Sequence, residues 1–260
     1  MKKNGFLKEI ILVVLGLLTL TCGKAAEKHH LNIVFIGNSI TQGVGLEKPS
    51  HEAPPVQAVL YLGRQAGVGE VKFSNQGVSG CTTVDYLPET HTLFDRAKQA
   101  ADQFADEDWA TLIFSIMLGT NDSAIKGTNG APVSPEQYTR NMMRIIDELL
   151  TLYPTCKVVV HRPIWYSPNT YNGTQYMQEG LDRLISYYPE IQKLVKTYEE
   201  KAPGQVFLGD TEAFGFFREN EAKFQHEQGN AGIFFLHPNK EGAKDLGEFW
   251  GKAIYNLLGL

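Results

Sequence analysis

Cysteine is scarce in this sequence, and the features typical of nucleic-acid-binding and membrane-spanning proteins are missing. Only three cysteines occur in 260 residues, too few to hold a domain together by disulfides. The net charge is −5 and there is no basic run, which gives no support to a nucleic-acid partner. The one long apolar run lies near the N-terminus, and no later segment is apolar over the length that a membrane span needs. What is present is 43% hydrophobic residues, enough for the core of one domain.

The N-terminal apolar run is predicted to be part of an export signal. Three lysines precede the run Ile10–Leu20, and small residues follow it. The run is too short to cross a hydrocarbon core about 30 Å thick. We therefore expect residues 1–25 to be a signal peptide cut after Ala25, with residues 26–260 as the mature domain in the periplasm or outside the cell. The alternative is a lipoprotein signal that ends at Cys22 and leaves a lipid anchor there.

The rest of the chain alternates between apolar, β-branched runs and helical patterns. The predicted strands are Leu31–Ile36, Val71–Ser74, Leu112–Leu118, Lys157–Val160 and Val206–Leu208. The predicted helices are Pro54–Gln65, Thr92–Ala105, Ser134–Leu152, Thr174–Lys201 with a break at Pro189, and Pro238–Leu258. Ser134 and Gln137 have the spacing of a capping box. Alternation of this kind predicts an α/β fold with a parallel sheet and helices on both faces.

Four short stretches place polar residues where this fold would bring them together. They are GNSIT at Gly37–Thr41, NQGVSG at Asn75–Gly80, GTND at Gly119–Asp122 and HPN at His237–Asn239. The first three follow predicted strands, and the fourth opens the last helix. Groups just past the carboxyl ends of parallel strands converge on one crevice. Cys81 would lie at this edge and Cys156 at the opposite one, so we expect the two thiols to be unpaired.

Ser39 and His237 are the candidate catalytic pair. A serine hydroxyl becomes nucleophilic when a neighbouring base takes its proton, and histidine is the side chain best suited to that task near neutral pH. Taken alone, Ser39 would more often be a helix cap, and a histidine before a proline is more often structural. The four stretches together favour the catalytic interpretation.

This set of motifs resembles the SGNH subgroup of the GDSL esterases and acylhydrolases. The resemblance implies a three-layer, flavodoxin-like sandwich with a five-stranded sheet in the order 2-1-3-4-5, and a serine esterase that uses neither cofactor nor metal. It also implies that the backbone N–H of Gly80 and the side-chain amide of Asn121 bind the oxyanion, whose stabilisation by such donors is a large part of catalysis. Gly77 is the competing glycine. Asn38 stands where the family usually has an aspartate.

The sequence has no acidic residue at the position where the family usually carries the acid of the catalytic triad. The family usually carries an aspartate three residues before the histidine, and this position is Phe234, within an apolar run. A backbone carbonyl could orient the imidazole and give a Ser–His dyad, which we prefer slightly to Asp210 as a third member. Glu212 shares the loop of Asp210, and Glu227 is a more distant candidate. A catalytically weak protein is the third possibility.

The loop after the fourth strand suggests the substrate. Arg162, Trp165 and Tyr166 lie in it, and exposed aromatic rings there could stack on a sugar, although the two rings could equally well pack the loop onto the domain. With no long apolar lid in the sequence, we expect a small-molecule or glycan ester as the substrate, with acetyl groups on carbohydrate favoured. Two alternatives are a polysaccharide O-acetyltransferase and a glycan-binding protein that has lost catalysis.

Overall fold

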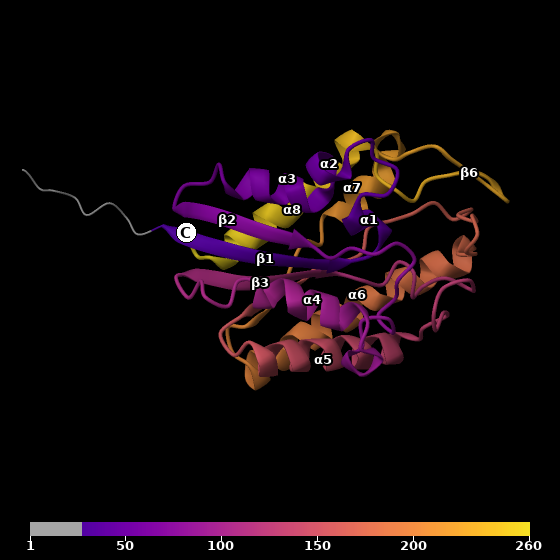
Figure 1. Ribbon diagram of the computed structural model, residues 1–260. Helices are drawn as coiled ribbons and strands as arrows, with labels where there is room; N and C mark the ends of the chain where they lie inside the picture. Colours follow the sequence, from indigo (N-terminus) through magenta and orange to yellow (C-terminus); the bar gives the residue numbers. More distant parts are fainter. Residues whose placement is uncertain (1–27) are drawn as a thin grey trace, which may run out of the picture.

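The predicted strands form one parallel sheet, which is the centre of the fold (Figure 1). The computed structural model describes residues 28–260, so the expected signal peptide and the possible lipid anchor at Cys22 lie outside the described residues. The strands are β1 (His29–Gly37), β2 (Val68–Asn75), β3 (Ala110–Met117), β4 (Lys157–Val160) and β5 (Val206–Leu208). Their order is β2-β1-β3-β4-β5, and each neighbouring pair is parallel. The predicted fold class and strand order are confirmed.

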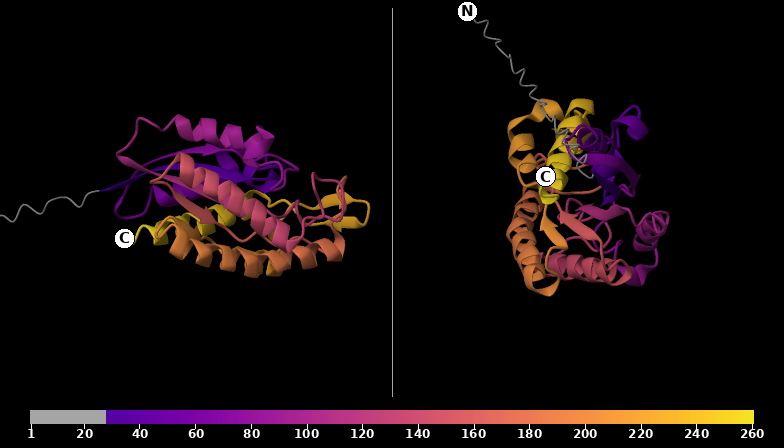
Figure 2. Two further views of the ribbon diagram at one scale, coloured as in Figure 1. Left: turned by 90° about the horizontal axis from the view of Figure 1, so that it is seen from below. Right: turned by 90° about the vertical axis from the view of Figure 1, so that its left-hand side faces the viewer.

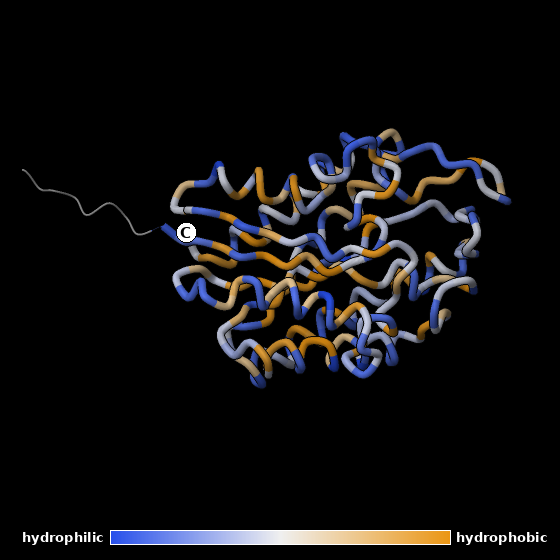
Figure 3. Tube along the Cα trace, viewed as in Figure 1, coloured by the Kyte–Doolittle hydropathy of each residue, from blue (hydrophilic) through white to orange (hydrophobic). Residues whose placement is uncertain are grey.

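Burial follows the hydrophobicity of the strands. Leu31–Gly37 of β1 and Val158–Val160 of β4 are fully buried, as is the second half of β3, because helices cover both faces of a parallel sheet. The buried side chains are apolar except for Asn32 in β1 and Ser115 in β3. The edge strand β2 is mostly half-buried. Figure 3 shows the resulting concentration of hydrophobic residues in the central strands.

The helices form two layers. They are α1 (Ser39–Gln42), α2 (Pro49–Glu52), α3 (Pro54–Leu62), α4 (Leu93–Asp102), α5 (Pro135–Leu152), α6 (Met177–Lys201), α7 (Ala213–Glu219) and α8 (Lys240–Leu257), with short 3₁₀ turns at Pro88–Thr90 and Glu221–Lys223. Helices α3 and α8 pack against each other on one face of the sheet, while α4 and α5 cover the other and α6 lies beside α5 and β5 (Figures 1 and 2).

Only one half of the capping box predicted at the start of α5 is formed. Ser134 Oγ accepts a hydrogen bond from the N–H of Gln137 at 3.2 Å. The side chain of Gln137 does not complete the box; its amide donates to Asn141 Oδ1 at 2.6 Å instead. One of the unpaired N–H groups at the start of the helix is therefore satisfied by Ser134.

The predicted break at Pro189 is wrong, because α6 continues through this residue. Proline removes one backbone donor and usually disfavours a helix interior. Here Leu184 and Tyr187 before the proline and Ile191 and Leu194 after it are all buried on the same side of the helix. Tertiary packing on both sides of the proline outweighs the local preference.

A hairpin at Glu227–Gly229 (β6) and Gly232–Phe234 (β7) was not predicted. Its strands are too short for a periodic pattern to identify them. The loop between β4 and α6, residues 161–176, holds the hairpin in place: the side-chain amide of Asn169 donates to the carbonyls of Ala231 (3.2 Å) and Ile233 (2.7 Å). We refer to residues 161–176 as the β4–α6 loop.

Two further observations concern the described part of the chain. None of its helices has both the length and the apolar character required to span a bilayer. Cys81 and Cys156 are buried and carry free thiols, as expected from their positions at opposite edges of the sheet.

Candidate active site

Ser39 is the first residue of α1, at the carboxyl end of β1. The helix cap is its neighbour Asn38, whose Oδ1 accepts the N–H of Ile40 at 3.0 Å. The Ser39 hydroxyl is therefore not used for capping, which removes the structural explanation for this serine. Ser39 is 7% exposed, and its position at a helix N-terminus favours negative charge that develops on its oxygen.

His237 meets Ser39 from the far end of the chain. Its Nε2 lies 2.9 Å from Ser39 Oγ. His237 precedes α8, whose cap is Asn239: the Oδ1 atom of Asn239 accepts the N–H of Gly242 at 3.0 Å. The side-chain amide of Asn239 also donates to the carbonyls of Ala222 and Phe224, which ties the start of α8 to the preceding turn. The imidazole is thus held at hydrogen-bond distance from the serine.

Glu227 is the third group in this chain of contacts. Its carboxylate oxygens lie 3.0 Å and 2.9 Å from His237 Nδ1, and one of them also accepts the backbone N–H of His237 at 3.1 Å. A carboxylate on Nδ1 fixes the tautomer with Nδ1–H, so that Nε2 is free to accept the proton of Ser39. The expectation of a dyad held by a backbone carbonyl is therefore wrong, because a carboxylate occupies that place.

The hairpin explains how Glu227 reaches the histidine. Glu227 pairs with Phe234 across the two strands, so the carboxylate comes from the residue opposite the position where the family usually has its aspartate. The sequence contains one indication of this hairpin. An apolar run is immediately preceded by the turn-forming residues Gly229, Asn230 and Gly232.

Asp210 and Glu212 are not in contact with the imidazole of His237. Asp210 Oδ1 accepts the backbone N–H groups of Glu212 (3.0 Å) and Ala213 (3.3 Å), as a residue before a helix commonly does. Burial raises the pKa of the Asp210 carboxyl to about 6. The Glu212 carboxylate is exposed and lies 3.6 Å from Lys252 Nζ. Both expectations for a third member in this loop are corrected.

Gly80 and Gly77 have different roles in the loop after β2. The N–H of Gly77 donates to Asn75 Oδ1 at 2.9 Å. A Cβ on Gly77 would lie 2.3 Å from the backbone of Gln42, so the absence of a side chain at Gly77 lets the loop pack onto α1. Gly80 has a φ of 78° and open space around the position of a Cβ. Its backbone N–H has no acceptor among the described residues, which leaves it available for a ligand.

Asn121 lies beside the Gly80 loop. Its amide Nδ2 donates to the carbonyl of Cys81 at 2.8 Å, and its Oδ1 accepts from the hydroxyl of Tyr176 at 2.6 Å. Cys81 Sγ in turn lies 3.3 Å from the carbonyl of Gly37. The end of β1 and the segments that follow β2 and β3 are thereby connected through Cys81, which keeps Gly80, Asn121 and Ser39 in one region. The contact with Tyr176 had no signal in the sequence.

The aromatic residues of the β4–α6 loop do not form an exposed platform. Trp165 is 7% exposed and Tyr166 is fully buried; Trp165 packs edge-on against Phe224 and the Tyr166 hydroxyl lies 2.8 Å from Ser123 Oγ. The expectation that these rings stack on a sugar is wrong, and the packing alternative holds. The substrate-binding role expected of Arg162 has no support, because its guanidinium packs on the rings of Tyr188 and Phe214, 4.3 Å and 3.8 Å from their centroids.

A second histidine, His161, is part of the core. Its Nδ1 accepts the backbone N–H of Asp210 at 2.9 Å, and its Nε2 lies 2.9 Å from Ser115 Oγ. Burial lowers the pKa of His161 to about 3, because a charged imidazole would lose its hydration. His161 is therefore neutral at pH 7 and structural.

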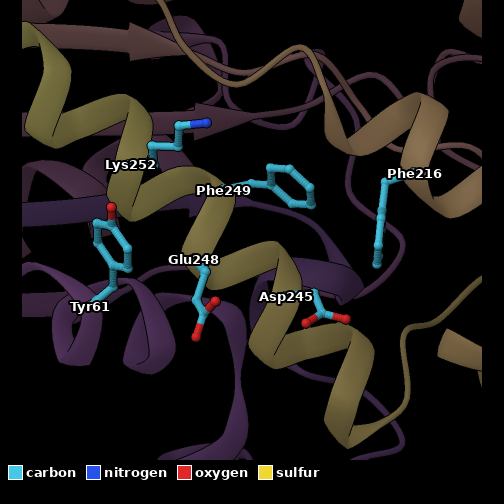
Figure 4. A pocket seen from close by; sticks show the side chains of 6 residues that line it. All are labelled: Tyr61, Phe216, Asp245, Glu248, Phe249 and Lys252. Carbon is cyan, nitrogen blue, oxygen red and sulfur yellow. The ribbon is translucent and has the colours of Figure 1, made fainter.

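A hollow on the outer side of α8 lies apart from the catalytic candidates. It does not include Ser39, His237, Gly80 or Asn121 (Figure 4). Its walls come from α3, α7 and α8 and consist of Tyr61, Phe216, Asp245, Glu248, Phe249 and Lys252. Within residues 28–260 no cluster of histidine, cysteine or acidic residues has the arrangement of a metal site.

The family is settled by the sequence match. Residues 35–244, which include all four motifs, match the model of the GDSL-like lipase/acylhydrolase family. The chain belongs to this family. It is a carboxylic ester hydrolase of the GDSL type, as the resemblance implied. Among curated proteins, none matches the chain.

Solved structures share the fold at low sequence identity. A carbohydrate acetylesterase from Sinorhizobium meliloti superimposes with a TM-score of 0.58 at 17% identity, covering 87% of this chain and 99% of that one. A lipase/acylhydrolase from Enterococcus faecalis gives 0.58 at 18% identity, with 87% and 96% covered. A two-domain esterase active on acetylated mannans gives 0.56 at 13% identity, with 88% and 50% covered. At these identities the likeness concerns the fold alone.

Proposed function

We propose that this GDSL hydrolase is a serine esterase with a Ser39–His237–Glu227 triad and that its substrates are short-chain, chiefly acetyl, esters of carbohydrates. The observation that carries the catalytic part is the continuous run of contacts from Ser39 Oγ to Nε2 and from Nδ1 to the Glu227 carboxylate, each within 3.0 Å. Nucleophile, base and orienting acid in this order define the triad in unrelated folds.

In the first half of the reaction, Ser39 Oγ attacks the ester carbonyl carbon while His237 Nε2 accepts the hydroxyl proton. Glu227 holds the imidazole in place and stabilises its positive charge. The oxyanion that forms accepts hydrogen bonds from the N–H of Gly80 and the amide of Asn121. The bond to the leaving alkoxide then breaks, the imidazolium returns its proton to this oxygen, and the acyl group stays on Ser39.

In the second half, water replaces the alcohol. His237 takes a proton from a water molecule, whose oxygen attacks the acyl-enzyme carbonyl at the same oxyanion site. Collapse of this intermediate breaks the bond to Ser39 Oγ, and the imidazolium returns the proton to the serine. Acetate leaves, and the free enzyme is restored. If a sugar hydroxyl took the place of water, the same site would transfer the acetyl group.

The catalytic assignment is tested by replacing the serine. We expect Ser39→Ala to reduce turnover of p-nitrophenyl acetate by a factor of about 10³ or more, since the variant lacks the nucleophile. Ser50→Ala is the matched control, because Ser50 is an exposed serine whose hydroxyl lies within hydrogen-bond distance of its neighbour His51 (2.9 Å to Nδ1) and is not in contact with His237. A folded Ser39→Ala protein that kept more than a few per cent of wild-type turnover would refute the assignment.

The carbohydrate part of the proposal rests on the expected export of the chain, on the absence of a long apolar lid in its sequence and on two fold neighbours whose names refer to acetylated carbohydrates. Acetate release from a panel of acetylated glycans tests it. Release from simple esters but from none of the glycans would contradict it, and transfer of label to added sugar without acetate release would identify an acetyltransferase.

The acyl preference can be measured separately. We expect p-nitrophenyl acetate to have a higher kcat/KM than the octanoate and palmitate esters, because a long chain would find no lid to cover it. A higher kcat/KM on the palmitate would indicate a lipase instead.

We also propose that the chain is exported by its N-terminal segment, which is cut after Ala25 or at Cys22. Cell fractionation of the full-length chain with N-terminal sequencing of the product tests this. Labelling by radioactive palmitate that is lost in Cys22→Ala would identify the lipoprotein form. A protein that stays in the cytoplasm with Met1 at its N-terminus would contradict both forms.

A further inference from the structure

The side chain of Asn121 has two fixed neighbours and one unused donor. The carbonyl of Cys81 can only accept, so the end of the amide that faces it must be Nδ2, which donates across 2.8 Å. The other end, Oδ1, then faces the hydroxyl of Tyr176 at 2.6 Å. One of the two N–H bonds of Nδ2 remains without a partner among the described residues, and Asn121 itself is only 2% exposed. This N–H is the one that can reach an oxyanion.

Tyr176 is built into the fold at the point where it meets Asn121. The residue is 3% exposed, and its ring packs edge-on against Tyr166. Its backbone N–H donates to the carbonyl of Thr170 at 3.1 Å, and the next residue, Met177, has a positive φ of 54°. Burial raises the pKa of the Tyr176 hydroxyl well above its usual range, so the group remains a hydrogen-bond donor over the whole working pH range.

These contacts have two consequences for the amide. Two partners at opposite ends prevent rotation of the amide, so that the free N–H keeps one direction. A hydrogen bond to Oδ1 also polarises the amide and strengthens its N–H donors, as happens in chains of hydrogen bonds. Both effects increase the stabilisation of negative charge at the site without placing Tyr176 in contact with substrate.

We propose that Tyr176 is a positioning residue of the oxyanion site, which acts on the reaction only through the Asn121 amide. The proposal rests on the proposed function, because it requires that Asn121 donates to the oxyanion. An oxyanion donor contributes in the transition state more than in the ground state, so its loss lowers kcat more than it changes KM. Tyr176 should show the same signature, with a smaller amplitude.

The test is a double-mutant cycle of Tyr176→Phe and Asn121→Ala, with p-nitrophenyl acetate as substrate. We expect Asn121→Ala to lower kcat by about 10²–10³-fold. Tyr176→Phe should lower it by at most about 10-fold, the factor that corresponds to the loss of one neutral hydrogen bond. Each variant should change KM little. In the Asn121→Ala background, Tyr176→Phe should change kcat by less than about twofold, because residues that act through one contact are not additive.

Tyr187→Phe is the matched control for the loss of a buried hydroxyl. Tyr187 is fully buried in α6, and its hydroxyl donates to the carbonyl of Val133 at 2.6 Å. Both phenylalanine variants leave one buried acceptor without its donor, which destabilises the folded state. We therefore expect similar decreases in the midpoint of thermal unfolding, but a lower kcat only in Tyr176→Phe.

The possible outcomes are distinct. A full effect of Tyr176→Phe in the Asn121→Ala background, an equal kcat loss in Tyr187→Phe, or no kcat loss in a folded Tyr176→Phe protein would overturn the positioning role and leave the esterase proposal standing. No loss of kcat in Asn121→Ala would overturn the oxyanion role of Asn121 and the role of Tyr176 with it. Ser39→Ala, measured in parallel, reports on the esterase proposal alone.

Discussion

Glu227 is the residue whose role differs most between sequence and structure. We expect Glu227→Gln to lower kcat on p-nitrophenyl acetate by about 10²–10⁴-fold while the fold is kept, because the amide can no longer stabilise the imidazolium and can hold the wrong tautomer; a comparable change in a serine protease costs about 10⁴. Steady-state kinetics and circular dichroism of the purified variant are the measurements.

Asp210→Asn provides the comparison for this acid. Its carboxylate accepts backbone N–H groups at the start of α7, so we expect the unfolding free energy to change and kcat to stay within about twofold. A large loss of kcat in Asp210→Asn together with none in Glu227→Gln would reverse the assignment.

His161 gives a prediction about pH. Its pKa is about 3 in the folded protein and about 6.5 in an unfolded chain, so between these values the unfolded state binds a proton that the folded state does not. The stabilisation that the neutral imidazole provides is complete above pH 6.5 and is lost as the pH falls below it. The free energy of unfolding can be measured with urea at pH 7 and pH 5 for wild type and for His161→Gln. We expect the difference between the two proteins, in favour of wild type, to be about 2 kcal/mol smaller at pH 5 than at pH 7.

Two buried carboxyl groups titrate in the same window and must be separated from this effect. Burial raises the pKa of Asp122 and of Asp210 to about 6, so each favours the folded state at low pH, in the opposite direction to His161. Both are present in wild type and in His161→Gln, and their contribution cancels in the difference. A difference between the two proteins that stays constant from pH 7 to pH 5 would show that His161 is not held neutral.

At the level of single residues, the sequence identifies those whose chemistry is tied to a motif. The motifs predict Ser39 and His237, and the structure brings the two side chains together. The sequence makes Glu227 a more distant candidate than the dyad or Asp210, because its position depends on a cross-strand pairing that no pattern of three residues can reveal. Trp165 and Tyr166 were expected to be exposed, but residue type does not determine on which side of a loop a ring packs.

The β6–β7 hairpin is the element on which the position of the acid depends. Gly232 has a φ of 94°, and a Cβ there would meet nothing within 4 Å, so Gly232→Ala introduces backbone strain of about 1–2 kcal/mol without a clash. We expect this strain to shift the hairpin and to lower kcat by about 10-fold. The measurement is kcat on p-nitrophenyl acetate together with the midpoint of thermal unfolding.

Gly204→Ala is the matched variant for backbone strain alone. Gly204 lies in the turn between α6 and β5, with a φ of 74° and the same open space. We expect Gly204→Ala to lower the midpoint of thermal unfolding about as much as Gly232→Ala does, and to keep the kcat of wild type. Equal kcat values in the two variants would show that the hairpin does not control the position of Glu227.

Elements differ in how well the sequence defines them. The strands β4 and β5 were predicted to the residue, and the other three to within a few residues, because buried β-branched runs bounded by polar turns have few other interpretations. The hairpin was missed because its pairing is tertiary information supported by Asn169 in a loop far along the chain. The continuation of α6 through Pro189 also reflects packing, which a local rule does not include.

For the whole molecule, the two buried thiols offer a measure of global opening. Cys81 and Cys156 are 4% and 1% exposed, and burial raises the pKa of the Cys156 thiol to about 12 and that of Cys81 further. In a chain that begins at residue 26, we expect both thiols to react with Ellman's reagent at one common, slow rate that is controlled by global unfolding and increases with urea. Rapid reaction of either thiol without denaturant would show that its part of the domain opens independently.

The β4–α6 loop has a consequence for how this enzyme can diversify. Through Asn169 it holds the hairpin that carries Glu227, the proposed acid, and through Tyr176 it holds the Asn121 amide, the proposed oxyanion donor. Loops of hydrolases commonly vary in length as specificity changes, but an insertion between these two residues would displace both halves of the catalytic apparatus together. New substrate specificity should therefore arise from length changes elsewhere on the catalytic rim, and this loop should be the segment that directed evolution leaves unchanged in length.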